Sequence, residues 1–409
     1  MTATELIKRA EKALQERFAC FEDIAYQNQV KILEAFQQHR VREAYFSPSS
    51  GYGYGDTGRD ELEEIYAEIM GAEEALLRST IVSGTHAISA CLQALVSPGQ
   101  EILSLAGRPY DTLCRVIGTG EPLRGTLTAK GIIYREAPLD RLGKPDPETI
   151  RSMIGPDTRL ALIQRSRGYM ARPSLTVGDI DALIRIVRAA NPETIVFVDN
   201  CYGEFTALLE PVQVGADIMA GSLIKNPGGG LAPSGGYVTG RRDMVEMVAE
   251  QLTAPGLGKA LGASLTDKRW FYQGLFLAPH TVLQALKGAA LLAHVFSEMG
   301  FEALPGWDID RGDIVQGIRL KSADQVLRFC QTVQASSPVD SDVRLEFARV
   351  PGYDEKIIMA AGTFVQGSSM ELSCDAPLRE PYIAYLQGGL TYEHCRWVVK
   401  RLAENMLEA

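Results

Sequence analysis

Residues 194–225 read TIVFVDNCYGEFTALLEPVQVGADIMAGSLIK, and this segment carries the pattern from which the fold class is predicted. Two apolar runs, at 194–199 and 216–221, are separated by a segment that contains glycine, proline and acidic residues. The first run ends at Asp199, and Lys225 follows the second. Apolar runs of this kind predict strands that are buried on both faces, which is typical of a parallel sheet covered by helices.

The same alternation of strand and helix patterns extends on both sides of this stretch. Apolar residues recur at helical spacing within 59–70, 83–92 and 179–190. Further strands are expected at 75–78, 101–105, 159–164 and 235–239. The sequence therefore predicts an α/β fold with a large, mainly parallel sheet.

The pattern also divides the chain into parts. Residues 1–50 are expected to form a helical arm, residues 51–270 the large domain, and residues 271–409 a linking helix and a smaller C-terminal α/β domain. A length of 409 residues fits this division, because domains average about 150 residues.

Composition excludes several classes of protein. Hydrophobic residues make up 46% and charged residues 22%, which excludes a disordered or coiled-coil chain. The net charge of −10 argues against a general nucleic-acid binder. The seven cysteines show no C-x-x-C spacing, and the charged N-terminus lacks an apolar signal segment. We therefore expect a cytoplasmic protein with no metal site and no nucleic-acid or membrane partner.

Two predicted strand ends carry reactive side chains. Ligands gather at the carboxyl ends of strands in open α/β sheets. Asp199 would bind a ligand there, or serve as a helix cap or salt-bridge partner. Lys225 would be either a solvated loop lysine or a nucleophile whose pKa is lowered in a low-dielectric site.

A third feature is Ser83-Gly84-Thr85, which precedes a predicted helix. Backbone N–H groups at a helix start bind phosphate and glycine permits close approach, although an ordinary capping turn has the same sequence. The glycine-rich stretch 228–236 lacks the G-x-x-x-x-G-K-[ST] spacing of nucleotide triphosphatases. An amine, an acid and a phosphate cradle together suit pyridoxal 5′-phosphate, which needs all three.

Several segments also carry a resemblance to a known family. They are VDNCY at 198–202, PVQVGAD at 211–217, SLIK at 222–225 and SGTHA at 83–87. The chain resembles the fold-type I pyridoxal-phosphate enzymes of cysteine and methionine metabolism in these segments. In GYGYGDTGR at 51–59 and QGGLTY at 387–392 it resembles the aluminium-resistance or methionine gamma-lyase-like branch. The resemblance implies the fold-type I transferase architecture.

The resemblance implies a role for each matching residue. Lys225 would hold the pyridoxal phosphate covalently, and Asp199 would pair with its pyridine nitrogen. Tyr110 would stack on the ring and help to protonate the leaving group, unless it is a core tyrosine. The residues expected at the phosphate are Ser83, Gly84, Thr85 and Ser222.

Two departures from the family pattern concern the cofactor. Ile224 stands where the family usually has a threonine. The family's Tyr-Ser-Arg segment, which reaches the neighbouring subunit's phosphate, is here Gly51-Tyr52-Gly53-Tyr54. Tyr54 is expected to substitute at the cofactor and Tyr52 at the substrate. Because fold-type I sites are usually built at a subunit interface, we expect a homodimer or homotetramer.

A third departure concerns the substrate carboxylate. The family's late arginine would align near Tyr385, so we expect Arg379 to replace it, because a guanidinium makes two bonds to a carboxylate. A surface salt bridge is the alternative for Arg379, and Arg165 and Arg167 compete for the role.

The resemblance implies a carbon–sulfur lyase that acts on a sulfur-containing amino acid, by cystathionine beta-lyase or methionine gamma-lyase-like elimination. The free amine of Lys225 would move protons as a general base and acid. Two alternatives remain open. One is an aminotransferase, because the carboxylate clamp departs from the lyase pattern, and the other is a catalytically weak pyridoxal-phosphate protein with a role in stress resistance.

Overall fold

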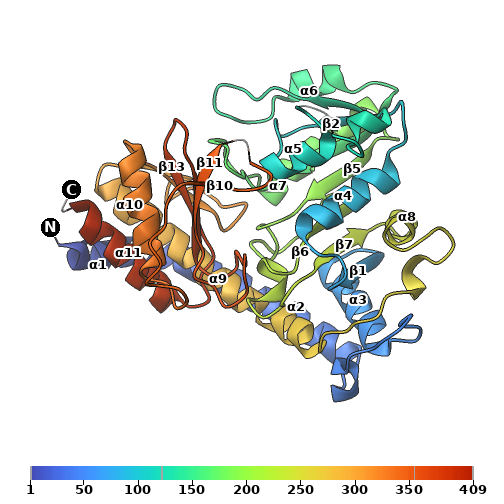
Figure 1. The fold of residues 1–409 in the computed structure, drawn as a ribbon, viewed down its shortest axis with the longest axis horizontal. Helices are drawn as coiled ribbons and strands as arrows, with labels where there is room; N and C mark the ends of the chain where they lie inside the picture. Colours follow the sequence, from blue (N-terminus) through green and yellow to red (C-terminus); the bar gives the residue numbers. More distant parts are fainter. Residues whose placement is uncertain (1, 121–122, 354, 408–409) are drawn as a thin grey trace.

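The computed structural model describes residues 2–120, 123–353 and 355–407. Its large lobe holds a seven-stranded sheet in the order β1-β7-β6-β5-β4-β2-β3 (Figure 1). The strands are β1 (Glu74–Arg78), β2 (Glu101–Ser104), β3 (Ile133–Glu136), β4 (Thr158–Gln164), β5 (Ile195–Asp199), β6 (Ile218–Ser222) and β7 (Gly236–Gly240). Strand β7 is antiparallel to β1 and β6, whereas the other pairs are parallel. The expected mainly parallel sheet is confirmed.

Strand β5 shows why its apolar run lacks alternating polar residues. Ile195 and Phe197 pack on one face of the sheet, in the cluster that contains α4 and α8, whereas Val196 and Val198 pack on the opposite face with α7. Both faces are therefore buried, as the sequence predicts. By the same alternation, Asp199 faces the side of α4.

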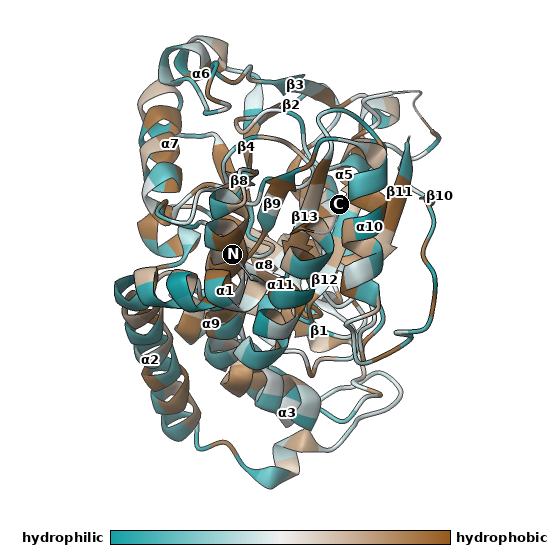
Figure 2. Ribbon diagram, turned by 90° about the vertical axis from the view of Figure 1, so that its left-hand side faces the viewer, coloured by the Kyte–Doolittle hydropathy of each residue, from teal (hydrophilic) through white to brown (hydrophobic). Residues whose placement is uncertain are grey.

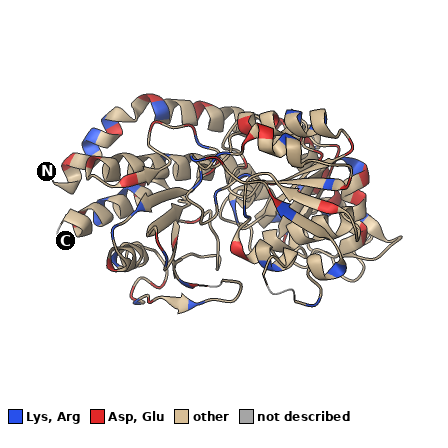
Figure 3. Cartoon of the chain, turned by 90° about the horizontal axis from the view of Figure 1, so that it is seen from above, with Lys and Arg blue, Asp and Glu red and all other residues tan. Residues whose placement is uncertain are grey.

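The second lobe is built on an antiparallel sheet of six strands in the order β10-β11-β12-β13-β9-β8. These strands are β8 (Glu302–Leu304), β9 (Gln316–Arg319), β10 (Ala348–Arg349), β11 (Lys356–Ala360), β12 (Ser373–Pro377) and β13 (Ile383–Gln387). The inner strand β13 is buried and mainly apolar (Figure 2), and its neighbour β9 is largely buried. Lys, Arg, Asp and Glu are spread over the outer helices with both signs interspersed (Figure 3).

Helices cover both sheets. They are α1 (Ala3–Ala13), α2 (Gln15–Gln38), α3 (Thr57–Met70), α4 (Gly84–Leu95), α5 (Asp111–Ile117), α6 (Pro147–Met153), α7 (Val177–Ala190), α8 (Arg242–Leu252), α9 (Arg269–Glu298), α10 (Ala323–Gln334) and α11 (Tyr392–Leu407). The N-terminal helices α1 and α2 pack along α9, and α11 lies beside α1 (Figure 1).

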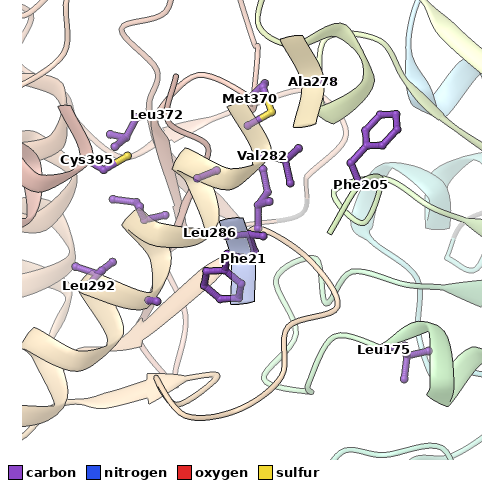
Figure 4. Close-up of a cluster of buried hydrophobic side chains, with 14 of the residues drawn as sticks. Phe21, Leu175, Phe205, Ala278, Val282, Leu286, Leu292, Met370, Leu372 and Cys395 are labelled. Carbon is purple, nitrogen blue, oxygen red and sulfur yellow. The ribbon is translucent and has the colours of Figure 1, made fainter. Parts of the chain in front are cut away.

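Helix α9 joins the two lobes through a common apolar core. Phe21 of α2 and Val282 and Leu286 of α9 belong to the same buried cluster as Met370 and Leu372, which precede β12 (Figure 4). Within the described residues, α9 is also the one helix long and apolar enough to cross a membrane. Because 67% of its most apolar segment is buried inside the protein, α9 fits the core helix of a folded domain equally well.

Glycine allows α9 to approach the segment that follows Lys225. A Cβ atom on Gly274 of α9 would lie 2.3 Å from the carbonyl oxygen of Gly228, and one on Gly229 would lie 2.2 Å from the carbonyl oxygen of Gly274. Distances this short are far below contact, so backbone must lie against backbone here. The glycine cluster after Lys225 therefore has a packing role.

We predict that Gly274→Ala lowers the free energy of unfolding by about 1–3 kcal/mol, because overpacking a tight contact displaces backbone. Urea unfolding measures this change. Gly178→Ala in α7 is the matched control, since its new Cβ would meet only the Thr176 hydroxyl at 3.7 Å. The control should be neutral or slightly stabilising. Equal effects of the two substitutions would contradict the packing argument.

Candidate active site

A cavity of about 200 Å³ lies at the carboxyl ends of β4, β5 and β6. Both lobes contribute to its wall, which consists of Thr85, Tyr110, Asp111, Thr112, Gln164, Ser166, Gly168, Tyr169, Asp199, Cys201, Tyr202, Lys225, Val315, Tyr353 and Gln387. The structure thus brings together Lys225, Asp199, Tyr110 and Thr85, which are far apart in the sequence.

Lys225 follows β6 and projects its amine into this cavity. Its Nζ lies 3.9 Å from the centroid of the Tyr202 ring, a distance at which a cation is attracted to the ring face. Burial alone would lower the pKa of the lysine, but Cys201, Tyr202 and Asp199 outweigh burial and raise the pKa well above its ordinary value. The lowered pKa expected from the sequence is therefore wrong, because acidic neighbours stabilise the ammonium form.

Asp199 ends β5 and is buried, with 3% of its surface exposed. Its Oδ1 accepts a hydrogen bond of 3.2 Å from the Cys201 backbone N–H. Burial raises the pKa of this carboxyl, while Lys225, the Cys201 amide and Arg172 act in the opposite direction. The partners that a buried carboxylate requires are thus a lysine, an arginine and a backbone amide.

The start of α4 lies close to Ser222 at the end of β6. A Cβ atom on Gly84 would lie 3.1 Å from Cβ of Ser222, so only glycine fits without displacement. The side chain of Ser83 caps the helix by accepting a 3.1 Å hydrogen bond from the His86 N–H. Because the first-turn N–H groups of Gly84 and Thr85 have no intrahelical acceptor, they can bind an anion together with the Ser222 hydroxyl.

Tyr110 closes the same side of the cavity. Its hydroxyl lies 3.0 Å from Oγ1 of Thr85, and its backbone N–H donates a 2.8 Å hydrogen bond to Oε1 of Gln164. Burial and the nearby Asp199 raise the pKa of the phenol. Tyr110 is therefore a neutral hydroxyl at physiological pH, able to donate a hydrogen bond.

Tyr52 and Tyr54 do not line this cavity. They are 72% and 65% exposed on a loop whose backbone is tied to Gly262 by a 3.0 Å hydrogen bond from its N–H to the Tyr52 carbonyl. The rings of Tyr52 and Tyr54 lie 5.8 Å apart, centroid to centroid. Within a single chain, these side chains face solvent.

The candidate arginines lie in three different environments. Arg379 pairs with Glu355 at 3.0 Å and donates to the Tyr169 carbonyl at 3.2 Å, at the protein surface. Arg165 is buried and donates to Asn200 and Thr206. Arg167 is 1% exposed and follows Ser166 of the cavity wall. None of the three belongs to the described lining of the cavity.

Sequence reasoning missed several residues of the cavity wall. Its members are Gln164, Tyr169, Tyr202, Tyr353 and Gln387. Gln164 ends β4, so the strand-end rule could have found it. Tyr202 has a φ of +72°, which no local sequence pattern marks, and Tyr353 and Gln387 come from the second lobe.

Glu204 lies behind Lys225, in the segment between β5 and β6. Its Oε1 accepts a 2.7 Å hydrogen bond from the Tyr237 hydroxyl, and its Oε2 has no hydrogen-bond partner among the described residues. The Asn226 side chain, next to Lys225, donates to the Glu204 carbonyl at 2.9 Å. Burial raises the pKa of the Glu204 carboxyl to about 8, so the neutral form is stable in the folded protein.

We predict that this group makes the protein less stable as pH rises. Between the ordinary glutamate pKa and about 8, the folded state holds a proton that the unfolded state has lost, so stability falls with pH. Glu204→Gln should weaken this dependence of the unfolding midpoint measured from pH 5 to pH 9. An unchanged pH profile in the variant would contradict the assignment.

Comparison with known proteins places these residues in context. A family model described as Methionine gamma-lyase matches residues 3–407. YnbB of Bacillus subtilis is 44% identical over 413 residues, which cover 100% of this chain and 98% of YnbB. L-methionine gamma-lyase of Treponema denticola is 25% identical over 202 residues, covering 48% of this chain and 45% of that enzyme.

A solved structure extends the comparison to three dimensions. The carbon–sulfur lyase involved in aluminum resistance from Clostridium novyi superposes with a TM-score of 0.94 at 45% sequence identity. The alignment covers 99% of this chain and 96% of that protein, so both lobes and the helices between them are shared.

Proposed function

The chain belongs to the methionine gamma-lyase family, which confirms the expected class of pyridoxal-phosphate-dependent carbon–sulfur lyase, and we propose how its residues carry this activity. In this proposal Lys225 holds the cofactor covalently and Asp199 pairs with its pyridine nitrogen. The single observation that carries it is the convergence of Lys225, Asp199, Tyr110 and Thr85 on one cavity.

The residues present fit the cofactor. The close approach of Gly84 to Ser222 leaves backbone N–H groups and one hydroxyl for a phosphate, with no Cβ in the way. Tyr110 lies beside Thr85 at the same end, where its ring can stack on a planar group. Asp199 lies on the side of α4, and a buried carboxylate stabilises a protonated ring nitrogen. Ser83 would act mainly by shaping the turn.

The proton movements fall to Lys225 and Tyr110. When bound, pyridoxal phosphate supplies a ring that withdraws electrons from the Cα–H bond of an amino acid. Pairing Asp199 with a ring nitrogen would take its charge away from Lys225, which removes one of the groups that raise the pKa of the lysine. Lys225 would take the proton from Cα, and the neutral Tyr110 hydroxyl would protonate the departing sulfur.

The substrate in this proposal is a sulfur-containing amino acid. Its net reaction with water gives a thiol, a 2-oxo acid and ammonia. The names of the Treponema denticola and Clostridium novyi relatives support this class. We also propose a soluble, cytoplasmic enzyme, since the apolar helix α9 is mostly buried in the core.

We predict that Lys225→Ala abolishes visible cofactor absorbance and lowers the rate of thiol and 2-oxo acid release by at least about 10²–10⁴-fold. The assay uses cystathionine, methionine and cysteine without a keto-acid acceptor. Lys400→Ala, in α11, is the matched control and should behave as the wild type. Product formation only with an acceptor would indicate an aminotransferase, and no turnover across a wide panel would indicate a catalytically weak protein.

We further propose that the active enzyme is a homodimer or a larger homo-oligomer. The loop with Tyr52 and Tyr54 is anchored to the segment around Gly262, and Leu257 and Leu265 of that segment are also exposed. These aromatic and aliphatic side chains form an apolar surface suited to a second copy of the chain. Tyr54 and Tyr52 of one subunit would complete the cavity of the other, at the cofactor and the substrate respectively.

We predict that Tyr54→Ala weakens both self-association and cofactor retention, because it removes a contact from each. Sedimentation velocity and titration with pyridoxal phosphate measure the two properties. Tyr26→Ala is the matched control, since Tyr26 is similarly exposed, at 68%, but belongs to helix α2. Retention equal to that of the wild type would count against a crossing loop.

A further inference from the structure

A second hollow, of about 640 Å³, lies outside the catalytic cavity, and the two share no residue among the described ones. Its wall is formed mainly by α2, the start of α7 and residues 307–311 of the loop before β9. We call it the α2–α7 hollow. Sites for small molecules usually have about 300–1,000 Å³, so its size suits such a ligand. The lyase reaction proposed above uses none of its residues.

Arg311 is the buried cation of this wall. Its side chain is 7% exposed, and its Nη2 donates a 2.6 Å hydrogen bond to Oε1 of Gln316. Its Nε and Nη1 have no hydrogen-bond partner among the described residues. Burial lowers the pKa of Arg311 to about 9, and the positive charges of Arg167 and Arg17 act in the same direction. Because buried donors without partners cost free energy, an anion that reaches this guanidinium is stabilised there.

The nearby carboxylates leave Arg311 unsatisfied. Asp313 faces it, but both oxygens of Asp313 already accept hydrogen bonds, from the Ser166 hydroxyl at 2.8 Å and the Val315 N–H at 3.1 Å. The acidic residues of the wall are all exposed to solvent, and they are Glu16, Asp308 and Asp310. Water screens exposed carboxylates far more than a buried guanidinium, so the arginine sets the charge inside the hollow.

Arg17 of α2 adds a second guanidinium to the same wall. Its Nη1 and Nη2 donate to the carbonyl oxygens of Asp308 and Ile309, and the exposed Asp310 pairs with Nη2 at 3.2 Å. The Nε of Arg17 has no partner among the described residues. Arg17 and Arg311 repel each other, since each lies within electrostatic reach of the other. An anion between them would remove this repulsion.

The start of α7 contributes backbone donors to the hollow. Thr176, Val177 and Gly178 belong to the wall. The N–H groups of Val177 and Gly178 are the first two of the helix and have no acceptor among the described residues, whereas the Asp179 N–H is capped by the Thr176 hydroxyl at 3.2 Å. Free N–H groups at a helix start, together with the helix dipole, favour an anion.

Close packing holds Arg311 beside this helix start. A Cβ atom on Gly312 would lie 2.2 Å from the carbonyl oxygen of Leu175 and 3.1 Å from the backbone nitrogen of Thr176. The loop before β9 therefore lies against the backbone that enters α7, and its Arg311 shares the hollow with the helix N–H groups. A buried, unsatisfied cation and a helix start are independent features, and both indicate an anionic ligand.

We propose that the α2–α7 hollow binds a phosphate group, free or attached to a small organic molecule, between Arg311, Arg17 and the first turn of α7. The free donors are Nε and Nη1 of Arg311, Nε of Arg17 and the two helix N–H groups. A carboxylate offers only about four lone-pair sites on two oxygens, whereas a phosphate presents at least three acceptor oxygens and more charge. This site goes beyond the lyase activity and does not depend on it.

The phosphate group has two sources, a phosphate monoester and inorganic phosphate. Phe21, Ile24 and Trp307 give the hollow an apolar side that suits the organic body of a monoester, whereas inorganic phosphate needs only the donors. Either ligand would join α2, α7 and the loop before β9, which belong to different parts of the fold. Bound phosphate should therefore raise the midpoint of thermal unfolding.

The test is a calorimetric titration of the cofactor-loaded protein at constant ionic strength with inorganic phosphate, phenyl phosphate and phenylacetate. Loading the cofactor first fills the candidate phosphate cradle at the start of α4, which would otherwise bind the same probes. Both phosphates should bind the wild type, and phenylacetate should bind at least about 10-fold more weakly than phenyl phosphate. Tighter binding of phenyl phosphate than of inorganic phosphate would identify a monoester as the ligand, and the reverse order would identify inorganic phosphate.

Two variants remove different donors. Arg311→Gln should weaken phosphate binding at least about 30-fold, because it removes a buried charged partner. Val177→Pro removes one helix N–H and should weaken binding about 10-fold. Proline is favoured at this first helical position, and Thr176 already has the extended backbone that a following proline requires, so the variant should unfold near the wild-type temperature. Arg185→Gln is the matched control, since Arg185 lies on α7 but is exposed and pairs with Asp181.

Three results would overturn the proposal. The first is a wild type that binds neither phosphate, or that binds phenylacetate as tightly as phenyl phosphate. The second is an unchanged phosphate affinity in Val177→Pro, which decides the question even if Arg311→Gln fails to fold. The third is an equal loss of affinity in Arg185→Gln and Arg311→Gln, because binding would then follow net charge rather than this hollow.

Discussion

The electrostatic attraction between Lys225 and Asp199, which line the same cavity, is the interaction on which the arrangement of the site depends. If either charge is removed, the other is left buried without its partner, which costs free energy. The parallel neighbours β5 and β6 hold the pair together, since both strands end at the same edge of the sheet. The start of α4 and the Tyr110 side chain then enclose the cavity from one side.

The glycines after Lys225 serve this arrangement in a way that differs from a phosphate loop. They let α9 touch the backbone of the segment after Lys225, so the helix that carries the second lobe also supports the segment that contains this lysine. Val315, Tyr353 and Gln387 of that lobe complete the cavity. The position of the cavity wall therefore depends on how α9 is seated.

The sequence predicted the large lobe well because its signals are local. The apolar run before Asp199 and the helical spacing over 179–190 correspond to β5 and α7. Strands β12 and β13 were missed, since each is short and β13 pairs with β9, which lies far earlier in the chain. At the cavity, the rule that ligands gather at the carboxyl ends of strands predicted Asp199 and Lys225, and both residues line it. The raised pKa of Lys225 and the pairing of Arg379 depend on neighbours that only the folded chain brings together.

The tyrosines of the cavity wall have a consequence for selectivity between chemical elements. Tyr110, Tyr169, Tyr202 and Tyr353 surround the space with aromatic rings. A thioether sulfur is large and polarisable, and each contact with a ring edge stabilises it by about 0.3–1.5 kcal/mol. An ether oxygen of the same chain length gains no comparable dispersion. The wall itself would thus favour sulfur over oxygen before any bond is broken.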